Sequence, residues 1–489
     1  MPRHATQIPG SYRLIPWQRS YFGSGGDGEA DAESVAGVVA EALASVDGSS
    51  DVAAFPDPQS GTVRGCQAVA LLGLLFAAGY VVRTTSGGPA VGVALYGMLS
   101  VPYLLAKLLL SLRYRTVQDP GPTGATLSVV VPFLNEDLAT FERCLEAILG
   151  QSVPAEQVFL VDDGSADMAC HDAALRVAAG HSNVTVHRFG ANQGKRAAQC
   201  WAISRSTTAL IATIDSDTVL HPHALAEAVK PFRDPRVNGV CGYARGLNSN
   251  QNLLTRLIDL RYTNAFLFER SAYSVLGSVL CSTGVLSLWR RDVIMANYHD
   301  YLGQSFWGRP AQFGDDRRLT AYALRTGRVV LQDSAMALTA LPERLPQFIR
   351  QQIRWNKSFI RESLLLLKEF QLRRVYWWLG LTEFLYWMIL TTMLLHAVLV
   401  RPVLHTRAPS WHYLAFVVIM SYARSTRMIG DRRLLPAAFL LAPLYGLMNL
   451  LLLVPLRLYS IARLHDETWG TRQNTTHSSP PLGAPRHRT

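Results

Sequence analysis

Cysteine is scarce in this sequence of 489 residues, and no two cysteines are separated by only two residues. A structural zinc site normally needs such close pairs, and a disulfide framework needs an even set in an oxidising compartment. Neither is expected here, and reduced thiols in the cytosol are the default for all six cysteines: Cys66, Cys144, Cys170, Cys200, Cys241 and Cys281.

The sequence also contains no internal repeat, no nucleic-acid-binding motif and no cleavable signal peptide. Its first long apolar run begins at residue 66, well beyond the roughly 15–30 residues of a signal peptide. Charged residues make up only 17% of the chain and hydrophobic residues 49%, which indicates a globular part combined with membrane segments. The formal net charge of +11 suits anionic lipids and an anionic nucleotide substrate.

Five apolar runs are candidates for membrane-spanning helices: 66–82, 89–112, 376–400, 411–423 and 434–461. A spanning helix needs roughly 20 apolar residues, which the first three approach or exceed. Three prolines interrupt the last run, which predicts two short or broken helices there. We expect two passes before the central region and four after it.

Basic residues flank the first two runs and crowd a predicted loop that contains Arg424, Arg427, Arg432 and Arg433. The positive-inside rule therefore places the N-terminus, the central region and this loop in the cytoplasm. Residues 1–61 are polar and rich in Gly, Ala and Ser, so we expect most of them to be disordered. The predicted domains are 1–61, 62–115 (two spans), 120–344 (catalytic), 345–370 (amphipathic helix), 376–463 (further spans) and 464–489 (cytosolic tail).

Short apolar strands alternate with helical stretches in the central region. The strands are expected at 126–135, 157–167, 183–189 and 209–215, with helices near 137–152 and 193–206. This alternation predicts a largely parallel sheet with helices on both faces. Ligands of such sheets bind beyond the carboxyl ends of the strands, which is where four aspartates fall: Asp162, Asp163, Asp215 and Asp217.

Each of these aspartates, taken singly, is explained as well by a turn or a helix cap. Asp215 and Asp217 are separated by one serine, however, and two carboxylates so close repel each other unless a cation lies between them.

Six motifs follow one another along the chain: VVPFLNED, VDDGSAD, NQGKRAAQ, DSDT, FGDDRRLT and QQIRW. With WGTR near the C-terminus, they resemble the processive inverting glycosyltransferases of the GT-A fold, which include hyaluronan, chitin and cellulose synthases. The similarity extends from about residue 65 to residue 472 and is greatest to hyaluronan synthases and their lipo-chitooligosaccharide-synthase relatives. It implies an α/β domain with a Rossmann-like mixed sheet, combined with transmembrane and amphipathic interface helices.

The resemblance assigns the donor side of the site. It implies that Asp217 and Asp215 hold Mg²⁺ or Mn²⁺, which clamps the diphosphate of a UDP-sugar. Asp163 corresponds to the acidic residue of the uridine pocket, and Lys195 to a basic contact with the nucleotide. A solvated lysine at a helix start explains Lys195 equally well without the family.

The acceptor side is assigned in the same way. Asp316 corresponds to the base that deprotonates the acceptor hydroxyl, and Asp315 to a residue that shapes the pocket. An acidic pair at a helix start is the alternative for both. Gln351, Arg354 and Trp355 match QxxRW, where the Trp stacks near the acceptor sugar and the Arg meets diphosphate. A basic amphipathic helix on the membrane surface would explain the segment 345–370 equally well.

The tail motif WGTR corresponds to a segment that closes over the diphosphate through Trp469 and Arg472, although the pair would also suit a membrane interface. The segment 281–291, CSTGVLSLWRR, departs from the family. Cys281 is retained at the acceptor side, but Val285 replaces a proline and Trp289 a tyrosine, which leaves the product open. Four basic residues are candidates to face a uronic acid: Arg290, Arg291, Arg350 and Arg354.

The expected function is a multi-pass enzyme of the plasma membrane with a cytoplasmic catalytic domain. It would polymerise UDP-GlcNAc and UDP-GlcA into hyaluronan on a growing polysaccharide acceptor and secrete the product, with no obligate protein partner. The alternatives are a chitin-type polymer of GlcNAc alone, a polyprenyl-phosphate sugar transferase, and a non-enzymatic scaffold on a degenerate transferase fold.

Overall fold

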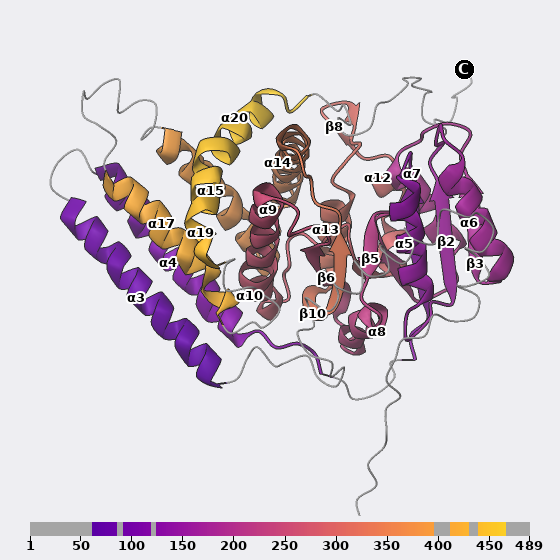
Figure 1. The fold of residues 1–489 in the computed structure, drawn as a ribbon, viewed down its shortest axis with the longest axis horizontal. Coiled ribbons are helices and arrows are strands. Elements are labelled where there is room, and N and C mark those ends of the chain that lie inside the picture. Colours follow the sequence, from indigo (N-terminus) through magenta and orange to yellow (C-terminus); the bar gives the residue numbers. More distant parts are fainter. Residues whose placement is uncertain (1–60, 86–90, 119–123, 396–410, 430–438, 466–489) are drawn as a thin grey trace, which may run out of the picture. The chain divides into compact units, whose positions relative to one another are not determined.

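The computed structural model describes residues 61–85, 91–118, 124–395, 411–429 and 439–465 (Figure 1). All of them belong to one compact unit, formed by 57–431 together with 435–489. The predicted N-terminal segment 1–61 lies outside the described residues except for its last residue, and so do the WGTR residues Trp469 and Arg472.

An eight-stranded mixed sheet forms the centre of the catalytic domain, in the order β3-β2-β1-β4-β7-β6-β10-β5. Strands β1 to β4 are parallel, whereas β7 runs antiparallel to β4 and β6, and β5 antiparallel to β10. The mixed sheet expected from the family is therefore present. The strands are β1 Leu127–Phe133, β2 Gln157–Asp162, β3 Val184–Arg188, β4 Leu210–Thr213, β5 Thr218–Leu220, β6 Val237–Gly246, β7 Ser287–Arg290 and β10 Arg328–Thr339.

Every residue of β1 is buried, as expected for an apolar, β-branched strand that is covered on both faces. The helix that follows begins at an Asp137 cap, whose carboxylate accepts a hydrogen bond from the Thr140 amide, and ends at Gly150. The helices around the sheet are α5 Leu138–Leu149, α6 Ala169–Gly180, α7 Lys195–Arg205, α8 Ala224–Val229, η1 Lys230–Arg233, α11 Arg291–Ala296, α12 Tyr298–Leu302 and α13 Asp315–Thr326.

A second group of helices lies between the sheet and the apolar segments of the chain (Figure 1). The helices α9 Leu253–Asn264 and α10 Ser271–Val275 are joined by the π-helical turn η2 Ala265–Arg270. The predicted amphipathic helix is present as α14 Leu345–Lys368, which contacts α13, α15 and α20. A small two-stranded hairpin, β8 Ser305–Phe306 and β9 Arg309–Pro310, precedes α13.

The predicted apolar runs are helical wherever they are described: α3 Gly61–Thr85, α4 Val91–Arg113, α15 Val375–Leu395, α17 Trp411–Ser425, α19 Ala442–Met448 and α20 Val454–Ala462. Side chains from α3, α4, η2, α15, α17 and α20 share one apolar core. Among the described helices, the run 442–462 alone meets the length and apolarity needed to cross a membrane.

Two expectations for the C-terminal region need correction. Residues 442–462 form one helix without a gap, in which α19 passes through the π-helical turn η5 Asn449–Leu453 into α20; Pro443 lies in its first turn, and Pro455 is accommodated directly after the π-helical turn. Arg424 and Arg427 do not lie in an open loop: Arg424 ends α17, and Arg427 is buried in η4 Thr426–Met428. The Arg427 guanidinium donates to the carbonyl of Leu267 and to Oε1 of Gln67.

Candidate active site

The DSD turn joins β4 to β5 at the carboxyl end of β4. The Asp215 amide donates to the Gly284 carbonyl over 3.0 Å, and Ser216 Oγ donates to Glu136 over 2.6 Å. Gly284 lies directly against the carboxylate, because a Cβ at this position would be 2.5 Å from Asp215 Oδ2. The turn that carries both aspartates is therefore fixed from two sides.

Lys195 connects the DSD turn to the GDD motif. Its ammonium lies 2.6 Å from Asp215 Oδ1 and 3.0 Å from Asp315 Oδ2. Burial alone would lower the pKa of Lys195, but the two carboxylates overcome this and hold its pKa above the usual value. Burial likewise opposes ionisation of Asp315, yet Lys195 and Arg196 keep its pKa below the usual value. Both groups are charged at neutral pH.

Asp163 holds the loop that leads to Lys195. Its carboxylate accepts hydrogen bonds from the backbone amides of Gln193 and Gly194, at 2.7 and 2.9 Å. Burial raises the pKa of Asp163 to about 7 despite these bonds. The neighbouring Asp162 has a structural role, since it accepts from Arg188 and from the Ser165 amide.

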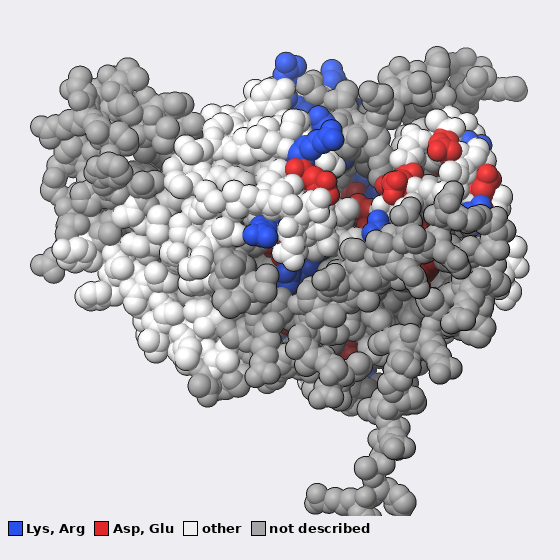
Figure 2. Space-filling model, in the orientation of Figure 1, with Lys and Arg blue, Asp and Glu red and all other residues white. Residues whose placement is uncertain are grey.

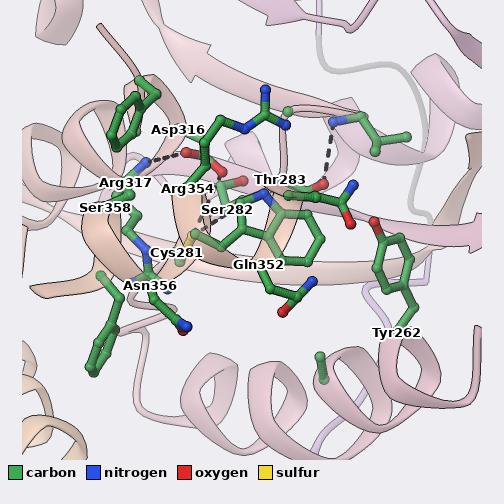
Figure 3. A pocket seen from close by; sticks show the side chains of 18 of the residues that line it. Tyr262, Cys281, Ser282, Thr283, Asp316, Arg317, Gln352, Arg354, Asn356 and Ser358 are labelled. Atoms are coloured by element: carbon green, nitrogen blue, oxygen red, sulfur yellow. Dashed lines mark hydrogen bonds between the residues drawn. The ribbon is translucent and has the colours of Figure 1, made fainter. Parts of the chain in front are cut away.

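The GDD motif starts helix α13. Gly314 has a φ of 85°, and a Cβ there would collide with Ser358 of α14, so glycine is required by both conformation and space. Cys281 Sγ lies 3.8 Å from Asp316 Oδ2 (Figure 3). Burial and the charge of Asp315 raise the pKa of Asp316 to about 6. Asp316 therefore binds a proton more tightly than an ordinary aspartate does, as a general base working near neutral pH would need to.

Helix α14 brings the QxxRW residues to the same space. Trp355 lies 6.1 Å from the ring of Tyr262 and 5.4 Å from the guanidinium of Arg261, centroid to centre. Gln351 Oε1 is buried and has no hydrogen-bond partner within the described part of the chain. Arg354, Asp316 and Tyr262 line the same cavity and are labelled in Figure 3. An aromatic platform and polar side chains therefore face the proposed base.

One cavity of about 870 Å³ is lined by every predicted site residue that the structure describes: Asp163, Lys195, Asp215, Asp217, Cys281, Asp315, Asp316, Gln351, Arg354 and Trp355. In Figure 2, acidic and basic side chains gather around the hollow in the middle of the displayed face. The structure thus brings together residues that are up to 192 positions apart in the sequence, from Asp163 to Trp355.

Several residues of the segment 281–291 lie elsewhere than expected. Trp289 is 1% exposed within the sheet and donates to Thr213, so its difference from the family does not reach the acceptor space. Arg290 and Arg291 donate to the backbone carbonyls of Val237 and Ile203, away from the cavity. Arg350 does not line the cavity either. Of the four arginines considered as partners of a uronic acid, only Arg354 lines the cavity.

Sequence reasoning missed Arg270 and Tyr262, and it noted Gly284 only as a retained residue of the segment 281–291. Arg270 lies in the π-helical turn η2, lines the cavity and donates to the Cys281 carbonyl over 2.9 Å. Tyr262 comes from α9 and Gly284 from the loop before β7. Arg270 and Tyr262 belong to none of the motifs, whereas Gly284 lies in the segment CSTGVLSLWRR, where a glycine can signal close backbone approach.

The DSD turn can offer two carboxylate ligands to a divalent cation, whose other ligands would be phosphate oxygens of the substrate and water. Within the described residues no group of three or more His, Cys, Asp or Glu side chains forms a metal cage. Two carboxylates with the phosphates and water are what Mg²⁺ commonly uses, and Mn²⁺ takes similar oxygen ligands. Asp215 and Asp217 both line the cavity; Asp215 contacts Lys195, and Asp217 accepts a hydrogen bond from Thr339 over 3.4 Å.

Comparison with known proteins supports the family. Residues 128–296 match the model "Glycosyl transferase family 2". The chain is 37% identical to a hyaluronan synthase of Streptococcus pyogenes over 78% of its own length and 92% of the relative. It is 30% identical to an N-acetylglucosaminyltransferase of Mesorhizobium japonicum, over the same shares.

A mannosyltransferase from Pyrobaculum calidifontis, solved with GDP-Man and Mn²⁺, has a similar fold. The TM-score is 0.52 at 19% identity, and the match covers 78% of this chain and 99% of that one. Sequence relatives, domain match and fold agree, and the chain belongs to the family 2 glycosyltransferases of the GT-A fold, in the group of the hyaluronan synthases and the rhizobial N-acetylglucosaminyltransferases.

Proposed function

We propose that the chain is a membrane-embedded, processive hyaluronan synthase that uses UDP-GlcNAc and UDP-GlcA. The observation that carries this proposal is the extent of the active-site cavity. The same cavity that contains Asp316 is also lined by residues of the apolar helices: Trp387, Leu390, Arg424, Tyr445, Leu453 and Arg457. A polymer extended at Asp316 therefore has a space that continues among these helices, which a single transfer to one lipid acceptor does not need.

Membrane insertion is part of the proposal. In Figure 2 the charged side chains that are drawn in colour gather around the hollow, whereas the described surface further to the left is largely white. Exposed apolar side chains on α3 and α15, among them Leu72, Phe76, Trp378 and Leu385, would contact lipid. We propose a plasma-membrane location with α14 at the cytoplasmic interface.

The chemistry follows from the positions of the side chains. Asp316 takes the proton of the acceptor hydroxyl, whose oxygen forms the new bond to the anomeric carbon while the bond to UDP breaks. UDP leaves with the bonding electron pair from the opposite side, so the configuration inverts. A divalent cation at Asp217 and Asp215 would neutralise the diphosphate. Lys195 is placed to contact the same phosphates, and Trp355 to stack on the acceptor sugar.

The experiment is incorporation of sugar by the purified chain from each UDP-sugar alone and from the pair. A polymer that requires both sugars and is cut by hyaluronidase is the expected result. The second candidate, a polymer of GlcNAc alone, is favoured by Val285, which lines the cavity where the family has proline. A product formed at full rate from UDP-GlcNAc and cut only by chitinase would show that candidate to be right. A lipid-linked monosaccharide would refute both.

A further inference from the structure

A second cavity, of about 450 Å³, lies where the end of α4 meets η1, β6 and β10. It shares no lining residue with the active site. Five of its lining side chains are cationic and one is anionic: Arg113, Arg115, Lys230, Arg233, Arg328 and Asp234. Such an excess of positive charge around one hollow attracts an anion, and arginine forks suit the oxygens of phosphate.

The wall contributed by α4 is held rigidly. The hydroxyl of Tyr114 donates to the Leu331 carbonyl over 3.1 Å, and the amide of Val117 donates to Gln332 Oε1, also over 3.1 Å. These bonds fasten the chain after α4 to strand β10. Arg113 and Arg115, which flank Tyr114, are therefore presented from a fixed backbone, which reduces the entropy lost when they bind a ligand.

Lys230 is paired over 2.6 Å with Glu227, which does not line the cavity, but Arg113, Arg115 and Arg233 still leave an excess of positive charge over the carboxylate of Asp234. Asp234 lies 2.9 Å from Arg236, which is outside the cavity, and 3.4 Å from Arg328. The hydrogen bonds from Arg236 lower the pKa of Asp234 to about 2, so the carboxylate stays ionised and occupied by its partners. Arg113 and Arg115 also line the hollow.

We propose that this cavity is a binding site for a phosphate group, which ties the end of α4 to the catalytic domain. Besides its cations the cavity is lined by Val117, Pro231, Val275 and Val330, so it also accommodates an apolar portion beside the phosphate. Two sources share this chemistry, the headgroup of an anionic phospholipid and free inorganic phosphate. The position at the end of an apolar helix is where a headgroup would lie if α4 spans a bilayer.

The test measures binding to the full-length protein in neutral detergent by calorimetry. The probes are short-chain phosphatidylglycerol below its micelle concentration, short-chain phosphatidylcholine and inorganic phosphate. We expect phosphatidylglycerol to bind more tightly than phosphatidylcholine. Arg113→Gln and Arg115→Gln should each weaken it about fivefold. Both residues are exposed and lie outside the active site, so the fold and UDP binding should be retained.

Arg373→Gln is the matched control, because Arg373 is an exposed arginine beside the apolar helix α15 and does not line the cavity. It should leave binding unchanged. Phosphatidylglycerol binding that inorganic phosphate does not displace identifies a lipid headgroup, and mutual competition identifies a general phosphate site. If all three variants lose the same affinity for phosphatidylglycerol, the binding depends only on general surface charge and the proposal is overturned. The proposal is also overturned if the protein binds neither phosphatidylglycerol nor inorganic phosphate.

Discussion

Lys195 donates to Asp215 across 2.6 Å, and the same ammonium lies 3.0 Å from Asp315. One cation thereby joins the donor-side DSD turn to the start of the helix that carries Asp316. Because both carboxylates contact the same ammonium, the position of each depends on Lys195. The donor and acceptor halves of the site are thus mechanically connected before any substrate is bound.

Replacing Lys195 tests this connection. Lys195→Met should weaken UDP binding, measured by calorimetry with Mn²⁺ present, by roughly 1.5–3 kcal/mol, the typical contribution of a hydrogen bond to a charged group. Lys195→Arg keeps the charge and should retain part of the affinity. Equal UDP affinity in the wild type and in Lys195→Met would show that Lys195 serves only to hold Asp215 and Asp315.

Asp217→Asn tests the cation site. We expect this variant to lose Mn²⁺ binding in the presence of UDP, measured by electron paramagnetic resonance, and to lose transfer, while the protein remains folded. Wild-type transfer should stop with excess EDTA and return with Mn²⁺ or Mg²⁺. Full transfer in EDTA would contradict a metal-dependent reaction.

Asp316→Asn tests the base. The rate of transfer should fall by about 10²–10⁴, the usual contribution of general-base catalysis. UDP affinity should change little, because Asp316 faces Cys281 and the acceptor space rather than the DSD turn. Asp292→Asn removes an exposed carboxylate of α11 and serves as the control with normal activity. Parallel losses of UDP affinity and activity would show that Asp316 has been assigned the wrong role.

The raised pKa of Asp316 predicts an acid limb in the pH profile. Since the base must be deprotonated, kcat/KM should be constant well above a pH of about 6 and, below that pH, approach a tenfold fall per pH unit. The residual activity of Asp316→Asn should lack this limb. A limb that persists unchanged in the variant would assign the titration to another group.

Gly284→Ala tests the close packing against the DSD turn. The new methyl group would lie 2.5 Å from Asp215 Oδ2, so the turn must shift and transfer should fall at least tenfold. Gly190→Ala is the control, since a Cβ at Gly190 meets nothing within 4 Å. Normal transfer by Gly284→Ala, measured with both UDP-sugars, would show that the turn tolerates displacement.

Local patterns in the sequence were sufficient for strands β1 to β4 of the catalytic domain, whereas strands β5, β6, β7 and β10 were not expected from it. The β-branched run at 127–133 and the acidic turns after β2 and β4 placed four aspartates at the carboxyl ends of strands, and the structure agrees. The amphipathic spacing of 345–368 likewise predicted α14. These features depend on side-chain periodicity and turn chemistry within a few residues, which the sequence displays directly. The roles of the acids came from the family resemblance and stay predictions.

Contacts between distant segments could not be read in this way. Trp289 and Arg290 follow closely in sequence on a loop that lines the cavity, but both belong to strand β7 and point away from the cavity. Trp289 donates to the hydroxyl of Thr213 within the sheet, and Arg290 donates to the backbone carbonyl of Val237. Arg270 reaches Cys281 only because the π-helical turn η2 redirects it. The sequence by itself determined which residues carry charge and where strands end. Tertiary structure alone decided which of those charges meet, because the meeting of Lys195 with Asp215 and Asp315 depends on how α7, β4 and α13 pack around one sheet.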